Sequence, residues 1–477
     1  MLDAVVVGAG PNGLAAAITL ARAGQSVHVI EAADAIGGGV RSAELTLPGF
    51  VHDVCSAIYP MGIGSPFFRD LPLAEHGLQW VHPELPLAHP LEGGRAVALR
   101  RSLDGTAEDL GEDGPSYAEL FRDLTERWRA LMAPPPRRLA DVVRPTPGLL
   151  RTGLAGLAPA ARVARRRFAT EGARALWAGL AAHGMQPLAR FGTGGFALSL
   201  GAAAHAVGWP FVRGGAQGLA AALAGVLRGH GGTIETGHEV RSLDELPSAR
   251  AVLLDVAPEA LARIAGEVLP VDYRDQLARF QRGPAAFKLD YALSQPIPWR
   301  AEVCRRAGVV HVGGSWSEVA LAFDEVARGQ HPTRPFVLVA QPSLFDRSRA
   351  PSGSSHHTAW AYCQVPEGSG RDMTEPLEAQ IERFAPGFRD VVLARHTLGP
   401  RQLEAHDANL VGGDIWGGAC DLRHLLFRPT PRLRPWTTPH PRLFLCSAST
   451  PPGPGVHGLC GFLAARAALR ALRRGLI

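Results

Sequence analysis

Short apolar runs alternate along this chain with longer segments in which apolar residues recur at helical spacing. Residues 4–7 (AVVV), 26–30 and 251–256 are runs of the kind found in buried parallel strands. A helical pattern over 14–23 ends at Gly24, and a second one runs to Leu227 before another strand at 233–236. This alternation of strands and helices predicts an α/β fold with a parallel sheet.

A glycine-rich turn, residues 8–13 (GAGPNG), joins the first strand to the first helix, and the second strand ends in Glu31. Gly10 lets the backbone approach a pyrophosphate, Gly13 permits close helix–strand packing, and Glu31 is placed to accept the ribose hydroxyls. An acid there disfavours a 2′-phosphate, which leaves NAD or FAD as the nucleotide. The predicted contacts are Gly8, Gly10, Pro11, Asn12, Gly13 and Glu31.

The residues after Glu31 distinguish between these cofactors. Residues 32–42 (AADAIGGGVRS), followed by 48–53 (PGFVHD), resemble the second flavin signature of the phytoene desaturase and amine oxidase superfamily. The arginine that usually follows the glycine pair directly is displaced here to Arg41. The resemblance implies FAD as a resident prosthetic group.

The resemblance continues through residues 209–240 and the C-terminal block 442–458 (RLFLCSASTPPGPGVHG), where residues 447–453 depart from the usual motif. The most similar branch is the phytoene desaturase-like one, which includes the pyridine nucleotide-disulfide oxidoreductase domain 2 proteins. In this superfamily the C-terminal glycine turn and helix face the flavin. The flavin contacts that the resemblance implies are Gly38, Gly39, Arg41, Val240, Ser447, Gly455, Val456 and His457.

These blocks are separated by other segments, which predicts two interleaved domains. A Rossmann-type FAD-binding domain, like that of glutathione reductase, is expected over 1–85, 205–285 and 405–477. An α+β substrate domain with a helical cap is expected over 86–204 and 286–404. At 477 residues, with 46% apolar and 19% charged residues, the chain can form two such cores and is not disordered.

Composition limits the other possibilities. The chain has no long apolar span, no basic leader and no C-x-x-C pair among its six cysteines, so we expect a cytoplasmic protein with free thiols. No cluster has metal-ligand spacing, so no metal is predicted. All but one of the 49 lysines and arginines are arginine, and they are scattered without aromatic residues between them, so no nucleic-acid partner is expected.

The single lysine, Lys288, is the sharpest catalytic candidate. It lies in an alternating segment, 287–293 (FKLDYAL), that resembles the amine oxidase strand whose lysine holds a water against flavin N5. A compact ammonium is suited to that task, and guanidinium is not its equivalent. The alternative is that Lys288 and Asp290 simply form the solvated face of a half-buried strand.

Two further features have both a functional and a structural interpretation. His457, at the start of the last helix, is a candidate catalytic residue lining the flavin site, although a helix-terminal role is favoured. Residues 149–180 include Arg162, Arg165, Arg166, Arg167 and Arg174 among apolar residues and could contact an anionic membrane peripherally; an ordinary cap helix is the favoured alternative.

The leading hypothesis is an FAD-dependent oxidoreductase that desaturates a hydrophobic small molecule by hydride transfer to flavin N5. A flavin amine oxidase is the second hypothesis, but only Phe444 and Phe462 lie near the C-terminal block, where an amine oxidase needs a Tyr or Trp cage. The third is a flavin-binding protein without turnover that acts through partners. The sequence makes no prediction of oligomeric state.

Overall fold

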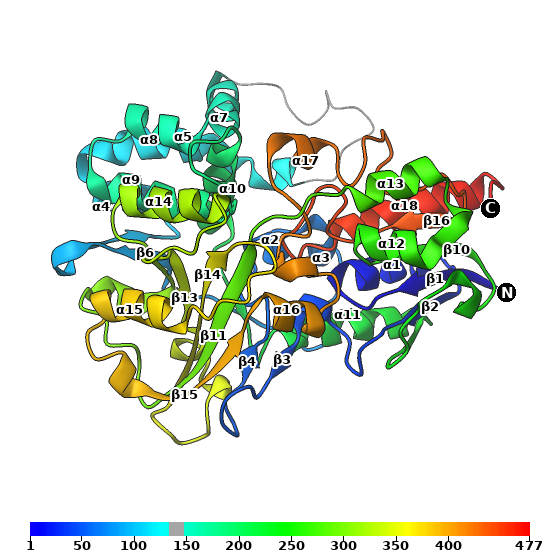
Figure 1. The fold of residues 1–477 in the computed structure, drawn as a ribbon, viewed down its shortest axis with the longest axis horizontal. Helices are drawn as coiled ribbons and strands as arrows, with labels where there is room; N and C mark the ends of the chain where they lie inside the picture. Colours follow the sequence, from blue (N-terminus) through cyan, green and yellow to red (C-terminus); the bar gives the residue numbers. More distant parts are fainter. Residues whose placement is uncertain (133–146) are drawn as a thin grey trace.

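Two sheets organise the computed structural model, which describes residues 1–132 and 147–477 (Figure 1). The first is a five-stranded parallel sheet in the order β16-β10-β1-β2-β9. Its strands are β1 (Leu2–Val7), β2 (Val27–Ile30), β9 (Thr233–Glu235), β10 (Ala249–Leu254) and β16 (Leu443–Leu445). Residues more than 400 positions apart in sequence therefore share one sheet.

Both faces of this sheet are covered by helices. Ala4 and Val6 point toward a core formed with α1 (Pro11–Ala21), α11 (Gln217–Gly229) and α18 (Leu459–Arg473). Val5 and Val7 point to the opposite face, which packs against α12 (Pro258–Ala265) and α13 (Val271–Ala278). Since alternate residues of a strand face opposite sides, an uninterrupted apolar run is required here.

The observed boundaries differ slightly from the expected ones. Helix α1 starts at Pro11 rather than Leu14, because proline lacks the N–H that would be unpaired in the first turn and has a helical φ. Strand β10 starts and ends two residues earlier than expected, at Ala249 and Leu254. The predicted α/β class and Rossmann-type sheet are confirmed.

The second sheet has seven strands in the order β15-β11-β14-β13-β12-β6-β7. Its strands are β6 (Leu85–Pro90), β7 (Ala96–Leu99), β11 (Ala285–Leu293), β12 (Ala307–Val312), β13 (Val337–Ala340), β14 (His357–Val365) and β15 (Val392–Leu398). Most neighbouring pairs are antiparallel, and β12 with β6 is parallel.

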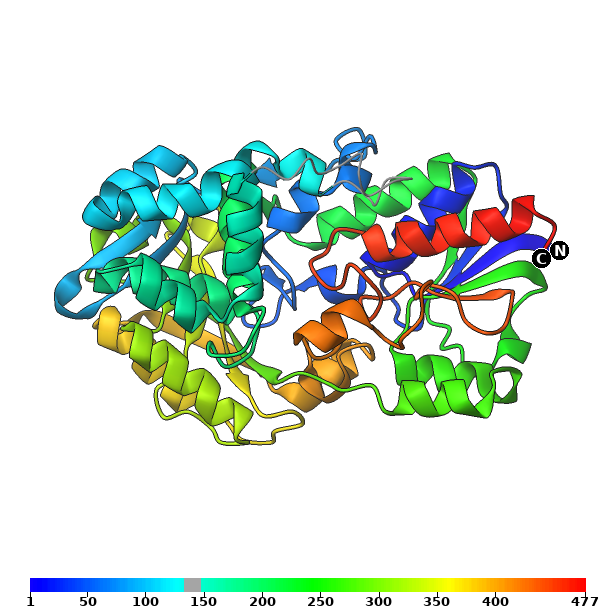
Figure 2. The same cartoon turned by 90° about the horizontal axis from the view of Figure 1, so that it is seen from above.

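A helical cap covers one face of this second sheet, and α15 (Thr374–Phe384) packs on the other. The helices of the cap are α4 (Leu103–Asp109), α5 (Gly114–Glu126), α7 (Pro147–Leu157), α8 (Ala160–Arg167), α9 (Glu171–Ala182), α10 (Thr193–Ala206) and α14 (Trp316–Ala327). Seen from above, this sheet and its cap form one lobe, while the parallel sheet and both termini form the other (Figure 2).

Strand β11 corrects one expectation. All nine of its residues are buried, so Lys288 and Asp290 do not form a solvated face. Strands β14 and β15 pair with β11 on either side, and β4 (His52–Asp53) comes from the nucleotide-binding part to cover these two side chains. The solvent-facing alternative for Lys288 is therefore wrong.

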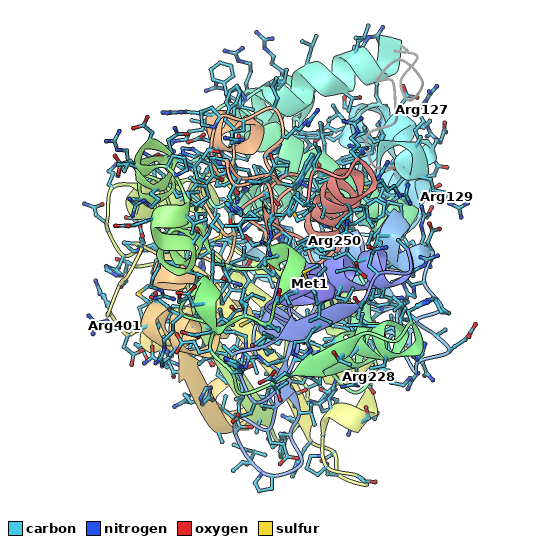
Figure 3. All side chains as sticks on the ribbon, turned by 90° about the vertical axis from the view of Figure 1, so that its right-hand side faces the viewer. Met1, Arg127, Arg129, Arg228, Arg250 and Arg401 are labelled. Atoms are coloured by element: carbon cyan, nitrogen blue, oxygen red, sulfur yellow. The ribbon has the colours of Figure 1, made fainter. Side chains whose placement is uncertain are left out.

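Many of the arginines are dispersed over the surface. Those labelled in Figure 3 belong to separate elements, such as Arg228 in α11, Arg250 in β10 and Arg401 in α16 (Pro400–His406). Many form exposed ion pairs, for example Arg100 with Asp109 at 2.6 Å. Within the described ranges, no helix combines the length and apolar character needed to cross a membrane.

A buried ion cluster joins the two lobes. The Arg349 guanidinium donates to Asp53 at 2.8 Å, to Asp346 at 3.2 Å and to the Val212 carbonyl at 2.7 Å, and the three charged side chains are 0% exposed. Asp53 also accepts from the Ala216 amide. Two carboxylates and a carbonyl thus compensate the buried guanidinium, as a charge in a protein interior requires.

Replacing Arg349 with Met should strongly destabilise the protein. The change leaves Asp53 and Asp346 buried without their cation, which costs about 3–5 kcal/mol of unfolding free energy. Urea unfolding followed by circular dichroism measures the loss. The matched control is Arg347→Met, since Arg347 is exposed in the same turn; equal midpoints for the two variants would contradict the assigned role of the cluster.

Candidate functional site

The glycine loop between β1 and α1 has little room for side chains. A Cβ on Gly13 would lie 2.0 Å from the Gly8 carbonyl oxygen, so this position requires glycine for helix–strand packing. A Cβ on Gly10 would approach only the Asp255 carboxyl, with Oδ2 at 3.0 Å. Apart from this carboxyl, no described atom outside the adjacent residues lies within 4 Å of that position.

Glu31 closes this loop from the end of β2. One carboxylate oxygen accepts from the Ala9 amide at 2.7 Å, and the other accepts from the Ala33 amide at 2.9 Å. The acid is thus held beside the glycine loop, as a ribose-binding carboxylate must be.

The second predicted signature lies directly against the first. A Cβ on Gly38 would be 3.4 Å from the Cα of Gly10, and the Gly37 amide donates to the Ala9 carbonyl. Arg41 donates from Nε to the Gly38 carbonyl at 3.0 Å and from Nη2 to the His406 carbonyl. Its guanidinium therefore positions the turn and joins it to α16.

The C-terminal block reaches the same place through α18. A Cβ on Gly461 would be 1.8 Å from the Asn12 carbonyl oxygen, so α18 and α1 touch backbone to backbone. Ser447 bonds Ser449, and Gly455 and Val456 have φ of 135° and 51° in the turn before α18. The structure thus brings the C-terminal predicted residues and the glycine loop together.

Val240 and His457, two other predicted flavin contacts, are both buried. Val240 is buried in the core on the α12 side of the parallel sheet. The Nδ1 of His457 accepts from the Leu459 amide at 3.0 Å, and burial lowers the pKa of His457 to about 4. The structure therefore gives His457 a neutral, helix-capping role at the start of α18.

Asp255, at the end of β10, is a site residue that the sequence interpretation did not identify. Its carboxyl accepts from the Gly13 amide at 2.7 Å and lies against Gly10. Burial raises the pKa of Asp255 to about 8, with Asp407 and Glu31 adding to the effect. The available signal was an acid placed immediately after an apolar strand, 251–254.

Arg428 was also missed. It is 0% exposed, and its Nη2 donates to the carbonyls of Trp416 and Gly417 at 3.3 and 2.7 Å. Its Nε and Nη1 have no acceptor among the described residues, and Nη1 lies 3.2 Å from the Cβ position of Gly453. Arg428 thus presents unused donors beneath the C-terminal turn.

Lys288 lies at the junction of the lobes. Its ammonium donates to Asp290 at 2.5 Å and lies 5.5 Å from the Trp360 ring centroid. Its positive charge acts to lower the pKa of the Cys55 thiol. The Cβ of Cys55 lies 3.9 Å from the position that a Cβ added to Gly39 would take. Lys288 therefore lies near enough to Cys55, a neighbour of the second glycine turn, to influence its thiol; its role at the flavin stays a prediction.

These residues fit a bound dinucleotide. The fit rests on the accessible loop at Gly10, on the carboxylate of Glu31 and on the buried Asn12 Oδ1, which has no partner in the described structure. Unused donors of Arg428 lie under the C-terminal turn. Such a site would hold the pyrophosphate at the N-terminus of α1 and the ring system between the two lobes.

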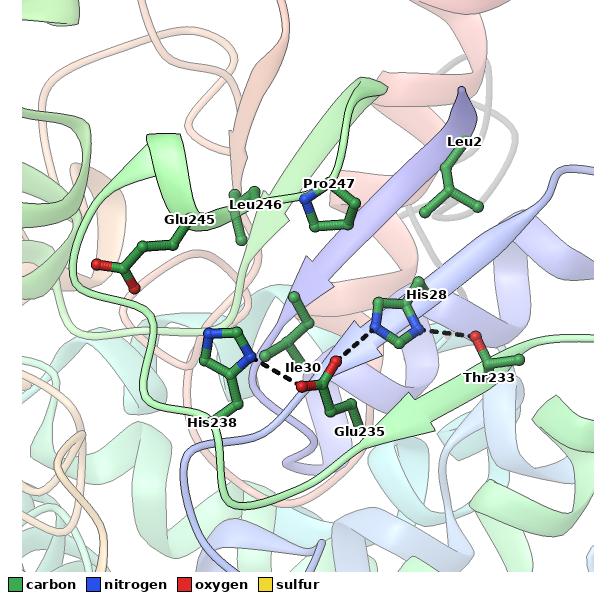
Figure 4. Close-up of a pocket in the computed structure, with 9 residues that line it drawn as sticks. All are labelled: Leu2, His28, Ile30, Thr233, Glu235, His238, Glu245, Leu246 and Pro247. Carbon is green, nitrogen blue, oxygen red and sulfur yellow. Dashed lines mark hydrogen bonds and ion pairs between the residues drawn. The ribbon is translucent and has the colours of Figure 1, made fainter.

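An open hollow elsewhere on the nucleotide-binding lobe does not belong to this site (Figure 4). It lies between β1, β2, β9 and the segment 245–247, and contains none of the predicted contacts. Glu235 pairs there with His28 at 3.1 Å and His238 at 2.9 Å. Both carboxylate oxygens are thus already engaged.

Comparison with known sequences confirms the resemblance to this superfamily. Residues 6–71 match the NAD(P)-binding Rossmann-like domain. The chain is 27% identical to pyridine nucleotide-disulfide oxidoreductase domain-containing protein 2 of Mus musculus, over 99% of this chain and 94% of that protein. One of the subunits of limonene dehydrogenase from Castellaniella defragrans is 33% identical over 26% of this chain and 22% of its own length.

Solved structures show the same two-lobed fold over the full chain. A putrescine oxidase bound to putrescine superposes with a TM-score of 0.61 at 17% identity, covering 100% of this chain and 99% of that one. Cyclohexylamine oxidase of Brevibacterium oxydans gives a TM-score of 0.59 at 15% identity, covering 100% of both chains. The predicted two-domain amine oxidase-like architecture is therefore confirmed.

Replacing Asp255 with Asn should stabilise the protein at higher pH. The carboxyl pKa is 3.8 without the fold and about 8 within it, so between these values the unfolded state holds fewer protons and wild-type stability falls as pH rises. Asn keeps the acceptor for Gly13 and cannot ionise.

The gain in unfolding free energy should be small near pH 4 and grow by roughly 1 kcal/mol per pH unit toward pH 8. Thermal unfolding of both proteins across this range measures it. A constant difference between variant and wild type at every pH would refute a protonated Asp255.

Proposed function

We propose that this chain is an FAD-dependent oxidoreductase that dehydrogenates a hydrophobic small molecule. The observation that carries this proposal is the convergence of three separated segments: the loop at Gly10, the turn at Gly38 and the turn before α18. Glu31 is suited to the ribose, the N-terminus of α1 to the pyrophosphate, and the N-terminus of α18 to negative charge on the ring system. When bound, FAD supplies the hydride acceptor.

The remaining task of the protein is to orient the substrate and exclude water. The cap-facing side of the second sheet is apolar: Leu87, Val309, Leu338 and Trp360 lie in one core with the cap helices. The name of one relative, a limonene dehydrogenase, points to a hydrocarbon substrate for that protein.

An amine oxidase is the second candidate, favoured by Lys288 and by the shared fold. In the C-terminal block and α18 the aromatic residues are two phenylalanines rather than the Tyr or Trp of an amine cage; Trp436, which precedes the block, donates to the Pro451 carbonyl at 2.8 Å. Phe444 is buried in the core beside α1, and Phe462 packs against Phe67 with ring centroids 5.4 Å apart. Neither is free to form a cage around an amine, so carbon–carbon desaturation is the better-supported reaction.

The purified protein should be yellow and contain about one non-covalent FAD per chain. Replacing Gly10 with Leu should remove the flavin while leaving the protein folded, because the added Cβ would lie 3.0 Å from Asp255 Oδ2 and distort the loop that is to hold the pyrophosphate. Flavin absorbance per chain and circular dichroism measure the two outcomes.

Gly229→Leu is the matched control for the Gly10 change, since a Cβ at Gly229 meets nothing within 4 Å, its φ is not positive and it lies outside the site. A folded wild-type protein that stays colourless in added FAD would overturn the proposed function.

We further propose peripheral contact with an anionic membrane through the cap. Leu150, Leu154 and Leu157 are 57%, 70% and 56% exposed on one face of α7. Phe191 lies beside them, because the Gly192 amide donates to the Leu157 carbonyl, and Arg162 lies 5.9 Å from its ring. Exposed apolar side chains flanked by arginine complement an anionic bilayer surface.

Vesicle sedimentation tests this contact. Phosphatidylcholine vesicles containing phosphatidylglycerol should bind the protein more tightly than phosphatidylcholine alone, and salt should weaken binding. Leu154→Ser with Leu157→Ser should weaken it at least about tenfold, because each inserted leucine contributes roughly 1.5–3 kcal/mol.

Leu321→Ser is the control for vesicle binding, since Leu321 is 52% exposed on α14. Unchanged vesicle binding by the α7 double variant would contradict membrane contact through this surface.

All six cysteines are free in the structure, which supports a reducing compartment such as the cytoplasm as the site of action.

A further inference from the structure

The only lysine of the chain is paired with a carboxylate inside the protein. Lys288 and Asp290 lie two residues apart on β11, so their side chains share a face of the sheet. Their side chains are 4% and 0% exposed, and Nζ lies 2.5 Å from Oδ1 of Asp290. A carboxylate this close cancels most of the field that an isolated ammonium would produce.

The other titratable groups around the pair do not restore a positive charge. His52, on β4, lies 3.7 Å from Asp290 Oδ1, and burial lowers the pKa of His52 to about 3. His396, opposite Asp290 on β15, also has a lowered pKa, and burial lowers that of His406 to about 4. Burial raises the pKa of Cys55 to about 12, which keeps the thiol neutral.

The more distant charges add no net positive charge. Asp53, which acts on Asp290, belongs to the cluster in which Arg349 faces two carboxylates, Asp53 and Asp346. Near the predicted cofactor site, Arg41 and Asp407 have opposite charges, and they shift the pKa of the Cys55 thiol in opposite directions. The Lys288–Asp290 pair is therefore neutral when Asp290 is ionised, and the surrounding ionised groups add no net positive charge.

This neutrality bears on which molecule receives the electrons. Transfer of one electron to dioxygen creates superoxide, an anion, and a nearby uncompensated cation stabilises it. A neutral Lys288–Asp290 pair gives little such stabilisation. An organic acceptor of the quinone class instead takes two electrons and two protons and leaves as a neutral hydroquinone, which requires no fixed positive charge.

We infer that Asp290 is a positioning residue that suppresses reaction with dioxygen by neutralising Lys288, so that the physiological electron acceptor is a quinone-type molecule. This inference rests on the proposed function, since it requires bound flavin next to Lys288. The two electrons and two protons taken from the substrate end on the quinone, and no oxygen is consumed.

The first test compares wild type, Asp290→Asn and the double variant Lys288→Met with Asp290→Asn. Each holoprotein is reduced anaerobically with dithionite and mixed with dioxygen or a soluble benzoquinone, and the return of flavin absorbance is followed. Wild type should react faster with benzoquinone. Asp290→Asn should react at least about tenfold faster than wild type with dioxygen, because it leaves an unpaired ammonium. The double variant, which has neither charge, should return to the wild-type rate.

A binding measurement separates this electrostatic role from a structural one. Sulfite is an anion that binds oxidised flavin, so its affinity reports the local charge without turnover. Asp290→Asn should bind sulfite at least about tenfold more tightly than wild type, and the double variant should not. Asp109→Asn, which breaks the exposed pair with Arg100, is the control and should change neither affinity nor rate.

Wild type supplies an independent test that needs no variant to fold. Burial raises the pKa of Asp290 to about 6, although Lys288 opposes the effect. As pH falls from 8 to 5, Asp290 takes up a proton, Lys288 becomes unpaired, and the rate with dioxygen should rise. In Asp290→Asn the rate should already be high and should not rise through this range.

Equal dioxygen rates and sulfite affinities in flavin-bound wild type and Asp290→Asn would overturn this inference and leave the proposed function intact. A wild-type rate with dioxygen that matches or exceeds the rate with benzoquinone would also overturn it. Failure of the proposed function is distinguishable, because it shows as wild-type protein that does not bind FAD.

Discussion

The buried cluster of Arg349 with Asp53 and Asp346 is the constraint on which the site depends. A guanidinium with no exposure is tolerated only where acceptors surround it, and here they come from both lobes. Asp53 follows His52 on β4, so the ion cluster also fixes His52 against Asp290. An interaction remote from the glycine loop thus sets how the second sheet meets the nucleotide-binding lobe.

A similar arrangement holds the nucleotide loop itself. Asp255 binds the Gly13 amide from a strand more than 240 residues later, and α18 presses Gly461 against Asn12 from the C-terminal end. The loop at 8–13 is therefore a local motif whose shape is supported by distant segments. The interleaving of domains follows from this, since neither sheet is completed by one continuous stretch of chain.

Local signals were sufficient to predict the parallel sheet, the glycine loop and Glu31, because each depends on neighbouring residues. The predicted flavin contacts could be grouped only through the superfamily resemblance. Asp255 had a local signal, an acid directly after an apolar strand, that was not used. Arg349 and Arg428 were beyond both approaches, since their roles arise from partners far away in sequence. The burial of Lys288 could not be predicted either, because the alternation within 287–293 is also compatible with a solvated face. Only the structure shows that β4 lies over this face.

The buried charges differ in how completely they are compensated. That difference distinguishes a charge that only stabilises the fold from one that can still act on a ligand. Arg349 has two carboxylates and a carbonyl, which satisfies it and leaves nothing for a ligand. Arg428 uses one nitrogen on two carbonyls and keeps two unused, beneath the turn proposed to meet the flavin. Lys288 lies between these cases, with a single carboxylate and an aromatic face as neighbours. A fully satisfied ion stabilises the fold, whereas a partly satisfied one retains donors and a field that a cofactor, a water or a substrate can use. Among these three buried cations, the incompletely paired ones, Arg428 and Lys288, are the ones that the proposed function places near the flavin.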